Sequence, residues 1–350
     1  ASQLEKFNLC RFSYFCNYGL NVRERQRAEI NPMQYGTIVH YILERFFGEY
    51  TKEEYLSLEE DKFQKIVCAY LAEYAVKYFG EEQLESNSFT YRLKTILDNV
   101  MYLMKHIMEE LSQSEFFVAD CELKIGEDIP SYTIVLPDGH KIAVCGSVDR
   151  VDIMQRADIT YLRIIDYKTG TKQFKLSDIL YGINLQMLLY LHSIEASGGD
   201  KYGEIVPAGI LYMPATVPYI SSDSLKSIDK LPDELNKKLK MNGLLLKDTE
   251  IIHGMDKTDV ATYIPVKIKA GEPVSSTSLA TLAEFGKIFK KVDMLIAEMG
   301  KNIYNGNIEA KPLKGGHDSC EYCPYDSVCA YRQSNPITCF SVDNKTVIEE

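Results

Sequence analysis

The chain has 350 residues, 45% of them hydrophobic, and a formal net charge of −11, which is enough apolar material for a large globular core. The negative charge excludes a protein that coats nucleic acid through bulk positive charge, although a local groove or a carboxylate metal site remains compatible with it. The chain contains neither an apolar stretch of the ~18 residues that a membrane helix requires nor a signal-peptide pattern at its start.

Helical patterns dominate the first part of the chain. Asn31-Pro32 predicts a helix start, because Asn caps helices and Pro favours the first helical position. Longer amphipathic stretches follow at about 53–79 and 82–114. We therefore expect a helical N-terminal part over residues 1–115.

At Phe116 the apolar pattern changes to a period of two, which indicates a sheet. Strands are predicted over 116–125, 132–136, 142–151, 161–167 and 204–213. Ser177-Asp178 is expected to begin a helix that runs to about His192. Strands with intervening helices favour a mixed central sheet flanked by helices, so residues 116–214 are expected to form an α/β core.

The last part of the chain has a less regular pattern. Residues 215–275 combine scattered Pro, Ser and Asp with short helical stretches, and we expect an insertion or arm there. A final helix is predicted over about 276–299, and the tail holds a group of cysteines. Residues 276–350 thus complete one α/β domain.

Two motifs place aspartates near strand ends. Asp149 follows a Gly-Ser-Val tripeptide, and Asp166-Tyr167-Lys168 ends a later strand. Residues two apart face the same side of a strand, so Asp166 and Lys168 project together while Tyr167 points into the core with its carbonyl group available. If the two strands are partners, Asp149 and Asp166 meet across the pair.

This arrangement is typical of a hydrolytic Mg²⁺ or Mn²⁺ site. Such cations prefer oxygen ligands, and Mg²⁺ usually binds one or two carboxylates with water and phosphate. The cation lowers the pKa of its water, and a neighbouring lysine orients that water or stabilises developing charge. The alternative is that the aspartates only cap strand ends while Lys168 is solvated.

Several neighbouring residues bear on this choice. His40 on the first strong helix, and Gln186 with Tyr190 on the helix after the DYK motif, favour a site. Glu122 on the first strand either reaches the metal or forms a structural salt bridge. Arg150 and Asp152 alternate onto the face opposite Asp149 and are interpreted as structural.

The combined set resembles the RecB-like branch of the PD-(D/E)XK nuclease superfamily: Gly36 with His40, Asp149, Asp166-Tyr167-Lys168, and Gln186-x-x-x-Tyr190. The resemblance implies a restriction-endonuclease-like core in which His40, Asp149 and Asp166 bind metal, with help from the Tyr167 carbonyl. It also implies that Lys168 assists the attacking water, and that Gln186 and Tyr190 support the site and contact DNA. Ile165 stands where the superfamily's name has Pro.

Cysteines form a second group. Nine cysteines, an odd number in a chain without a secretion signal, are a poor disulfide framework. Cys320-x2-Cys323-x5-Cys329 can hold a metal ion or one edge of a cluster. The candidates for a fourth ligand are Cys10, Cys16, Cys339 and His317. From spacing alone, zinc is the generic choice.

The two ends of the chain resemble AddB/RexB-type helicase–nuclease subunits. The similarity lies around Cys10, in the segment from Cys320 to Cys329, and in Asn242-Gly243-Leu244-Leu245-Leu246 with Met255-Asp256. It implies that Cys10, Cys320, Cys323 and Cys329 bind a [4Fe–4S] cluster, which would staple a very long loop. Zinc and four unrelated thiols are the alternatives.

The resemblance implies the nuclease domain of an AddB-like subunit that works with an AddA-like partner on double-strand DNA ends. The expected reaction is Mg²⁺-dependent exonuclease hydrolysis of a DNA single strand for recombinational repair. A start at Ala1 without Met agrees with a piece of a longer protein, and the expected location is the cytoplasm. Without a G-x4-G-K-[ST] loop, this piece is not expected to hydrolyse ATP. The rival functions are a non-catalytic, cluster-stapled DNA-binding module and a stand-alone exonuclease.

Overall fold

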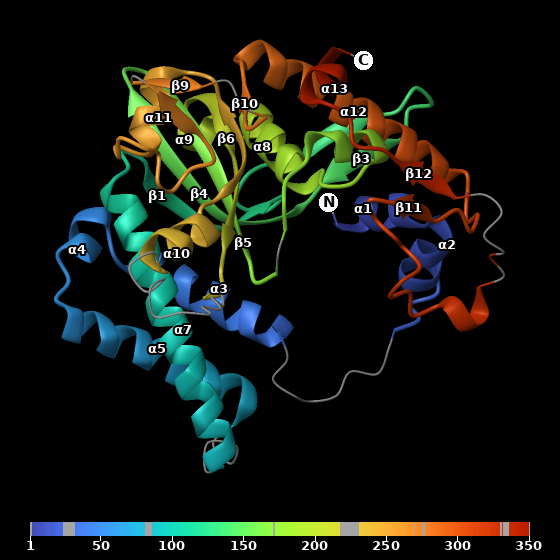
Figure 1. The fold of residues 1–350 in the computed structure, drawn as a ribbon. Coiled ribbons are helices and arrows are strands. Elements are labelled where there is room, and N and C mark those ends of the chain that lie inside the picture. The colour runs from blue at the N-terminus through green and yellow to red at the C-terminus, as the bar shows by residue number, and fades with distance from the viewer. Residues whose placement is uncertain are drawn as a thin grey trace.

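The computed structural model describes residues 2–23, 32–80, 86–170, 172–217, 231–269, 271–274, 277–329, 331 and 336–349. Asn31, the expected helix cap, and parts of the 215–275 segment lie outside these residues. Figure 1 shows a twisted sheet with helices on both sides.

The main sheet has six strands in the order β1-β4-β5-β6-β7-β10. These strands are β1 (Phe117–Ile125), β4 (Gly146–Arg156), β5 (Ile159–Lys168), β6 (Glu204–Pro214), β7 (Asn242–Leu246) and β10 (Leu279–Ala280). β5 pairs with β6 in parallel, and β4 pairs antiparallel with both β1 and β5. This mixed sheet between helices confirms the predicted α/β fold.

Helices cover both sides of the sheet. α3 (Pro32–Glu49) and α7 (Asn87–Ser112) lie on one side with α5 (Glu60–Phe79) packed against them, and α8 (Gln186–Ser197) and α12 (Leu282–Tyr304) lie on the other (Figure 1). The short α4 (Lys52–Leu56) precedes α5, and α9 (Gly199–Tyr202) follows α8. None of the helices that the structure describes is long and apolar enough to cross a bilayer.

Two local predictions differ from the structure. The helix expected from Ser177 is a 3-10 turn, η2 (Leu176–Tyr181), and α8 begins only at Gln186. Gly182 ends the turn with a left-handed φ of 68°, which breaks the helical path. The strand expected over 142–151 is divided: β3 (Lys141–Val144) pairs with β2 (Tyr132–Val135) in a separate hairpin, and β4 starts at Gly146.

The segment expected to be irregular contributes to the main sheet, because β7 pairs with β6 and β10. The apolar side chains of β7 are buried, which explains why this short strand joins the core. Around it lie α10 (Leu231–Leu239), α11 (Thr249–Met255), β8 (Lys267–Lys269) and β9 (Glu272–Val274). The predicted last helix begins later than expected, at Leu282, where Thr281 and Glu284 form a capping box.

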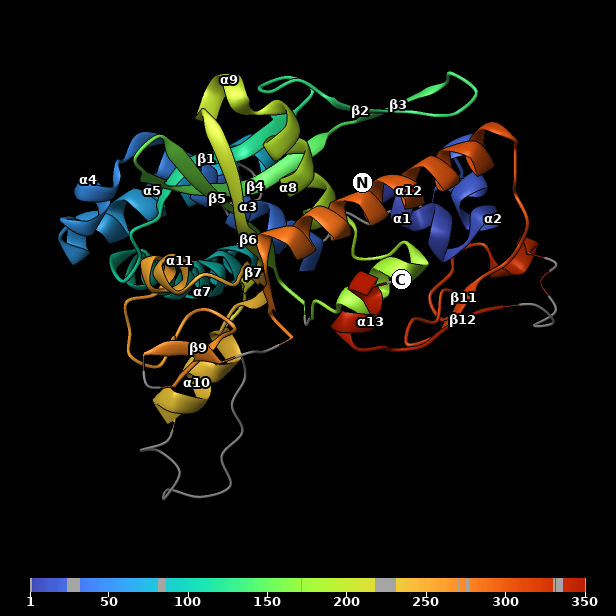
Figure 2. The ribbon, with the colours of Figure 1, turned by 90° about the horizontal axis from the view of Figure 1, so that it is seen from above.

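The two ends of the chain lie side by side, as Figures 1 and 2 both show in blue and red. The N-terminal elements are α1 (Ser2–Leu9), α2 (Arg11–Tyr14) and η1 (Phe15–Gly19). The C-terminal elements are β11 (Leu313–Gly315), η4 (Asp326–Val328), β12 (Ile337–Cys339) and α13 (Asn344–Glu349). The Tyr325 hydroxyl donates to the Val22 carbonyl oxygen at 2.8 Å, which ties the ends together.

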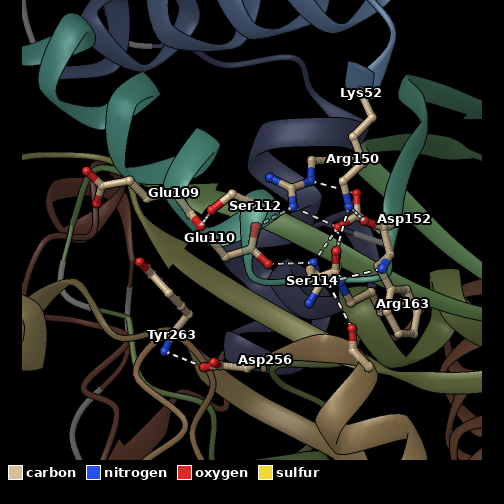
Figure 3. A network of polar contacts seen from close by, with 12 residues as sticks. Lys52, Glu109, Glu110, Ser112, Ser114, Arg150, Asp152, Arg163, Asp256 and Tyr263 are labelled. Atoms are coloured by element: carbon tan, nitrogen blue, oxygen red, sulfur yellow. Dashed lines mark hydrogen bonds and ion pairs between the residues drawn. The ribbon is translucent and has the colours of Figure 1, made fainter. Parts of the chain in front are cut away.

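A buried ion network joins β4, β5 and α7 (Figure 3). Its members are Arg150, Asp152, Arg163 and Glu110, and all four side chains are fully buried. Arg150 pairs with Asp152 at 2.7 Å and with Glu110 at 3.0 Å, and Arg163 lies 2.6 Å from Glu110. The charges balance, as burial in the core requires. The structural role predicted for Arg150 and Asp152 is confirmed.

Candidate functional site

β4 and β5 bring Asp149 and Asp166 together where the two strands separate. The last ladder pair is Arg150 with Ile165, so the two aspartates are the next residues on the two strands. The Asp149 Oδ2 atom accepts the backbone N–H of Tyr167 at 2.9 Å. This bond holds the Asp149 carboxylate beside the DYK motif, and the predicted partnership of the two strands is confirmed.

The DYK side chains alternate as the sequence predicts. Lys168 Nζ lies 2.5 Å from Asp166 Oδ2, so these two residues share one face of β5. Tyr167 points inward, where its hydroxyl accepts a hydrogen bond from Arg150 at 3.3 Å. Asp166 is buried and Lys168 is partly exposed, so the lysine is the solvent-facing member of the pair.

His40 of α3 and Glu122 of β1 complete the group. The ligand atoms of His40, Glu122 and Asp149 all lie within 4.8 Å of one another. His40 Nδ1 is 3.0 Å from Glu122 Oε1, and His40 Nε2 is 3.7 Å from Asp149 Oδ2. The position of Glu122, which the sequence left open, is therefore in the site.

The backbone of Glu122 is strained. Its φ of 51° is left-handed, which is uncommon for a residue other than glycine. Such a conformation persists only where the surroundings impose it, often at functional sites. The Ser147 hydroxyl donates to Glu122 Oε2 at 2.7 Å and holds the side chain in place. Ser147 was not predicted from the sequence, although it lies two residues before Asp149 and therefore on the same face of the strand.

The electrostatics of this group fit a divalent cation. Burial and the neighbouring Asp166 carboxylate raise the pKa of Asp149 to about 7. Burial alone would lower the pKa of His40, but the hydrogen bond with Glu122 and the charge of Asp149 raise it. Burial would raise the pKa of Glu122, yet hydrogen bonds with His40 and Ser147 lower it. Crowded carboxylates with an imidazole are ligands that Mg²⁺ or Mn²⁺ accepts, and a cation would offset their repulsion.

Gln186 and Tyr190 lie at the edge of this group. Both line a cleft of about 700 Å³ together with Gly146 and Ser147. A Cβ atom on Gly146 would lie 2.0 Å from the Tyr190 hydroxyl oxygen, so the glycine lets the tyrosine approach β4. The N–H of Gln186 donates to Glu5 of α1 at 3.0 Å, and this acidic side chain caps α8.

The four predicted cluster ligands meet at a separate place. Cys10, Cys320, Cys323 and Cys329 line one cavity of about 170 Å³ between the two chain ends. Cys16 is a neighbour of these thiols. Burial, and then the charges of Cys323, Cys329 and Cys10, raise the pKa of Cys16. His317 is 3.3 Å from Asp178 instead. Cys339 lies in β12, where it is paired with Gly315.

A single zinc ion would require the four thiols to lie close together. Four thiolates at about 2.3 Å from one zinc would place their sulfur atoms within about 4 Å of one another. Within the described ranges, only His40, Glu122 and Asp149 form a group of three or more ligand atoms within 4.8 Å of each other.

Comparison with known proteins identifies relatives. Residues 1–330 match the PD-(D/E)XK nuclease superfamily. The chain is 35% identical over 343 residues to an ATP-dependent helicase/deoxyribonuclease subunit of Thermoanaerobacter sp. (strain X514). The proteins of the same name from Clostridium acetobutylicum and Acetivibrio thermocellus are 33% identical over 348 residues and 34% identical over 344 residues.

These alignments cover 95% of this chain but only 29 to 30% of each relative. The chain thus spans less than a third of the length of the curated relatives it matches. The predicted resemblances to the superfamily and to the AddB-type helicase–nuclease proteins are both confirmed.

Proposed function

Because the chain belongs to the PD-(D/E)XK nuclease superfamily, we propose that it is a metal-dependent deoxyribonuclease that hydrolyses DNA phosphodiesters. The observation that carries this proposal is the convergence of His40, Glu122 and Asp149 beside the Asp166–Lys168 pair. DNA as the substrate is supported by the word deoxyribonuclease in the names of the relatives.

His40, Asp149 and Asp166, with the Tyr167 carbonyl, would hold Mg²⁺ or Mn²⁺, and Glu122 is placed to join them. When bound, the cation would lower the pKa of a coordinated water and offset negative charge on the scissile phosphate. The Tyr167 N–H fixes the orientation of the Asp149 carboxylate.

Lys168 is the partly exposed cation of the site. It would donate a hydrogen bond to the attacking water or to a phosphate oxygen, where positive charge stabilises the transition state. Gln186 and Tyr190 would support the carboxylates and contact the DNA from the adjoining cleft.

Cys10, Cys320, Cys323 and Cys329 would bind a [4Fe–4S] cluster. The cavity that the four cysteines share supports this assignment. Its role would be structural, because it would link two segments that lie far apart in the sequence. Measuring iron and acid-labile sulfide in anaerobically purified protein tests the assignment, and stoichiometric zinc without sulfide would contradict it.

In the whole protein, this chain would form the nuclease part of a helicase–nuclease complex. It would act as an exonuclease on a single strand from a double-strand end, together with an AddA-like partner in the cytoplasm. The product would serve recombinational repair. The assignment to such a complex is supported by the names of the relatives, which describe one subunit of a helicase/deoxyribonuclease.

The test is degradation of end-labelled single-stranded DNA in Mg²⁺. Asp166→Ala should lower the rate by about a hundred-fold or more, because a ligand and the partner of Lys168 are both lost. Asp158→Ala, at the exposed turn between the same two strands, should keep the native rate. A folded, cluster-loaded native chain that degrades no DNA, even with its partner subunit, would favour the binding-module function instead.

A further inference from the structure

A cleft of about 740 Å³ leads from the carboxylates along α3 and α5. At one end it is lined by His40, Glu122 and Lys168, and further along by Tyr41, Tyr74 and Tyr78. A row of tyrosines therefore shares one cleft with the proposed hydrolytic centre. The metal site does not account for these aromatic side chains.

The three tyrosine rings pack against one another. The ring centroids of Tyr74 and Tyr78 are 4.4 Å apart at an interplanar angle of 34°, and those of Tyr41 and Tyr74 are 5.2 Å apart. Tyr74 is buried, whereas Tyr78 is 55% exposed. The ring of Tyr78 is therefore accessible to a ligand and packs against the buried ring of Tyr74. A ring held in this way loses little conformational freedom when a ligand binds.

Positive charge accompanies the row. Lys77 Nζ lies 5.1 Å from the ring centroid of Tyr78 and 5.9 Å from that of Tyr41. Lys124 and Lys168 line the same cleft together with the acidic Glu44. Lys124 also pairs with Glu127, and Lys168 with Asp166. The carboxylate of Glu73 accepts a hydrogen bond from the Tyr41 hydroxyl at 2.8 Å and lies 3.6 Å from the Arg45 guanidinium. The negative charge of Glu73 is therefore partly offset.

An exposed ring beside lysines suits single-stranded nucleic acid. Every base has a face that stacks on an aromatic ring, and lysines neutralise the phosphates between bases. In a duplex, each base is already stacked between its neighbours and does not reach such a ring. Local positive charge of this kind would let a chain with a net charge of −11 hold a polyanion.

We propose that Tyr78, backed by Tyr74 and flanked by Lys77, is a base-stacking site for single-stranded DNA. The inference rests on the proposed function, because the nuclease site determines which bond lies next to the stacked base. It adds a reason for strand selection: an unpaired base must be available on the strand that enters the cleft. Tyr78 binds and positions the substrate and takes no part in the hydrolysis itself.

The experiment uses the full, cluster-loaded chain and oligonucleotides that carry 2-aminopurine at successive positions. Ca²⁺ replaces Mg²⁺ so that binding is read without hydrolysis, and stacking on a tyrosine quenches the fluorescent base. The variants are Tyr78→Ala and Tyr78→Phe. The matched control is Tyr91→Ala, a 73% exposed tyrosine of α7 that does not line the cleft.

Tyr78→Ala should weaken binding by about 5- to 150-fold, the usual effect of losing one base–aromatic stack. It should also abolish quenching at one position of the oligonucleotide. Tyr78→Phe and Tyr91→Ala should match the native chain. The salt dependence of binding should keep its slope in Tyr78→Ala, because no charge is removed, whereas Lys77→Ala should reduce the slope. In Mg²⁺, Tyr78→Ala should raise KM and leave kcat nearly unchanged.

The outcomes separate this inference from the proposed function. Native quenching and affinity in a folded Tyr78→Ala chain that still cleaves DNA would overturn the stacking site and leave the nuclease intact. Position-specific quenching without any cleavage by the native chain, even with its partner subunit, would support the stacking site and refute the nuclease. Equal loss in Tyr78→Ala and Tyr78→Phe would show that the hydroxyl matters, and would also overturn the stacking site.

Discussion

Replacing Glu110 with alanine should destabilise the protein strongly. Glu110 is fully buried on α7, and its two carboxylate oxygens bind separate guanidinium groups, Arg163 at 2.6 Å and Arg150 at 3.0 Å. Without it, two buried cations share the single carboxylate of Asp152, and solvent does not reach them. Breaking a buried pair by removing one partner costs about 3–5 kcal/mol.

That free energy converts into a shift of the unfolding midpoint. The entropy of unfolding is about 2.1 cal/mol/K per residue. For 350 residues unfolding as one unit, the total is about 0.7 kcal/mol/K, so the midpoint should fall by about 4–7 °C. Glu110→Gln should lose less, because the amide oxygen still accepts one hydrogen bond.

The assay is thermal unfolding followed by circular dichroism, with Glu109→Ala as the matched control. Glu109 precedes Glu110 on α7 but is not buried in the network, so its removal should change the free energy of unfolding by no more than about 0.5 kcal/mol. A Glu110→Ala chain that melts within about a degree of the control, on the scale set by that entropy, would refute the account. The network would then be open to water, or free to rearrange.

Further predictions concern the two sites. In the metal-free chain, the folded state binds the Asp149 proton more tightly than the unfolded state does. The stability that this carboxyl contributes is therefore full below about pH 4 and is lost as pH rises through about 7. Thermal unfolding of the protein with a chelator present, measured across this pH range, should show the loss. An Asp149→Asn chain with the same pH dependence as the native chain would contradict the prediction. Cys329→Ser should lose iron and sulfide while Cys339→Ser keeps them, and full iron content in Cys329→Ser would exclude it as a ligand. Gly146→Ala would place a methyl group 2.0 Å from the Tyr190 hydroxyl oxygen. The cleavage rate should fall, and the free energy of unfolding should fall by about 1–3 kcal/mol. Native values for both quantities would show that the close approach is unimportant.

The parts of the fold that were predictable from sequence are those with a local pattern. β1, β5 and β6 lie close to their expected positions, because alternation and turn residues are properties of neighbouring amino acids. The meeting of Asp149 and Asp166 followed from the same alternation once the two strands were assumed to pair. His40 needed more: its place beside Asp149 was implied by family resemblance, since nothing local distinguishes it from another helical histidine.

The features that escaped prediction depend on long-range packing or on unusual backbone geometry. β7 joins the sheet through pairing with β6 and β10, and no short pattern announces those partners. Glu122 was a candidate whose role the sequence left open, and its left-handed φ of 51° is not indicated by any sequence pattern of glutamate. The row of tyrosines comes from two helices, α3 and α5, so it exists only after they pack.

The proposed reaction depends on a cation held by the carboxylates where β4 and β5 separate. The most direct measurement titrates Mn²⁺ into metal-free protein, follows the free ion by electron paramagnetic resonance, and assays cleavage in the same samples. Asp149→Asn should lose tight Mn²⁺ binding and cleavage together, whereas Asp158→Asn, at the exposed turn of the same hairpin, should keep both. Native Mn²⁺ affinity in an inactive Asp149→Asn chain, or full cleavage by that chain, would contradict the claim.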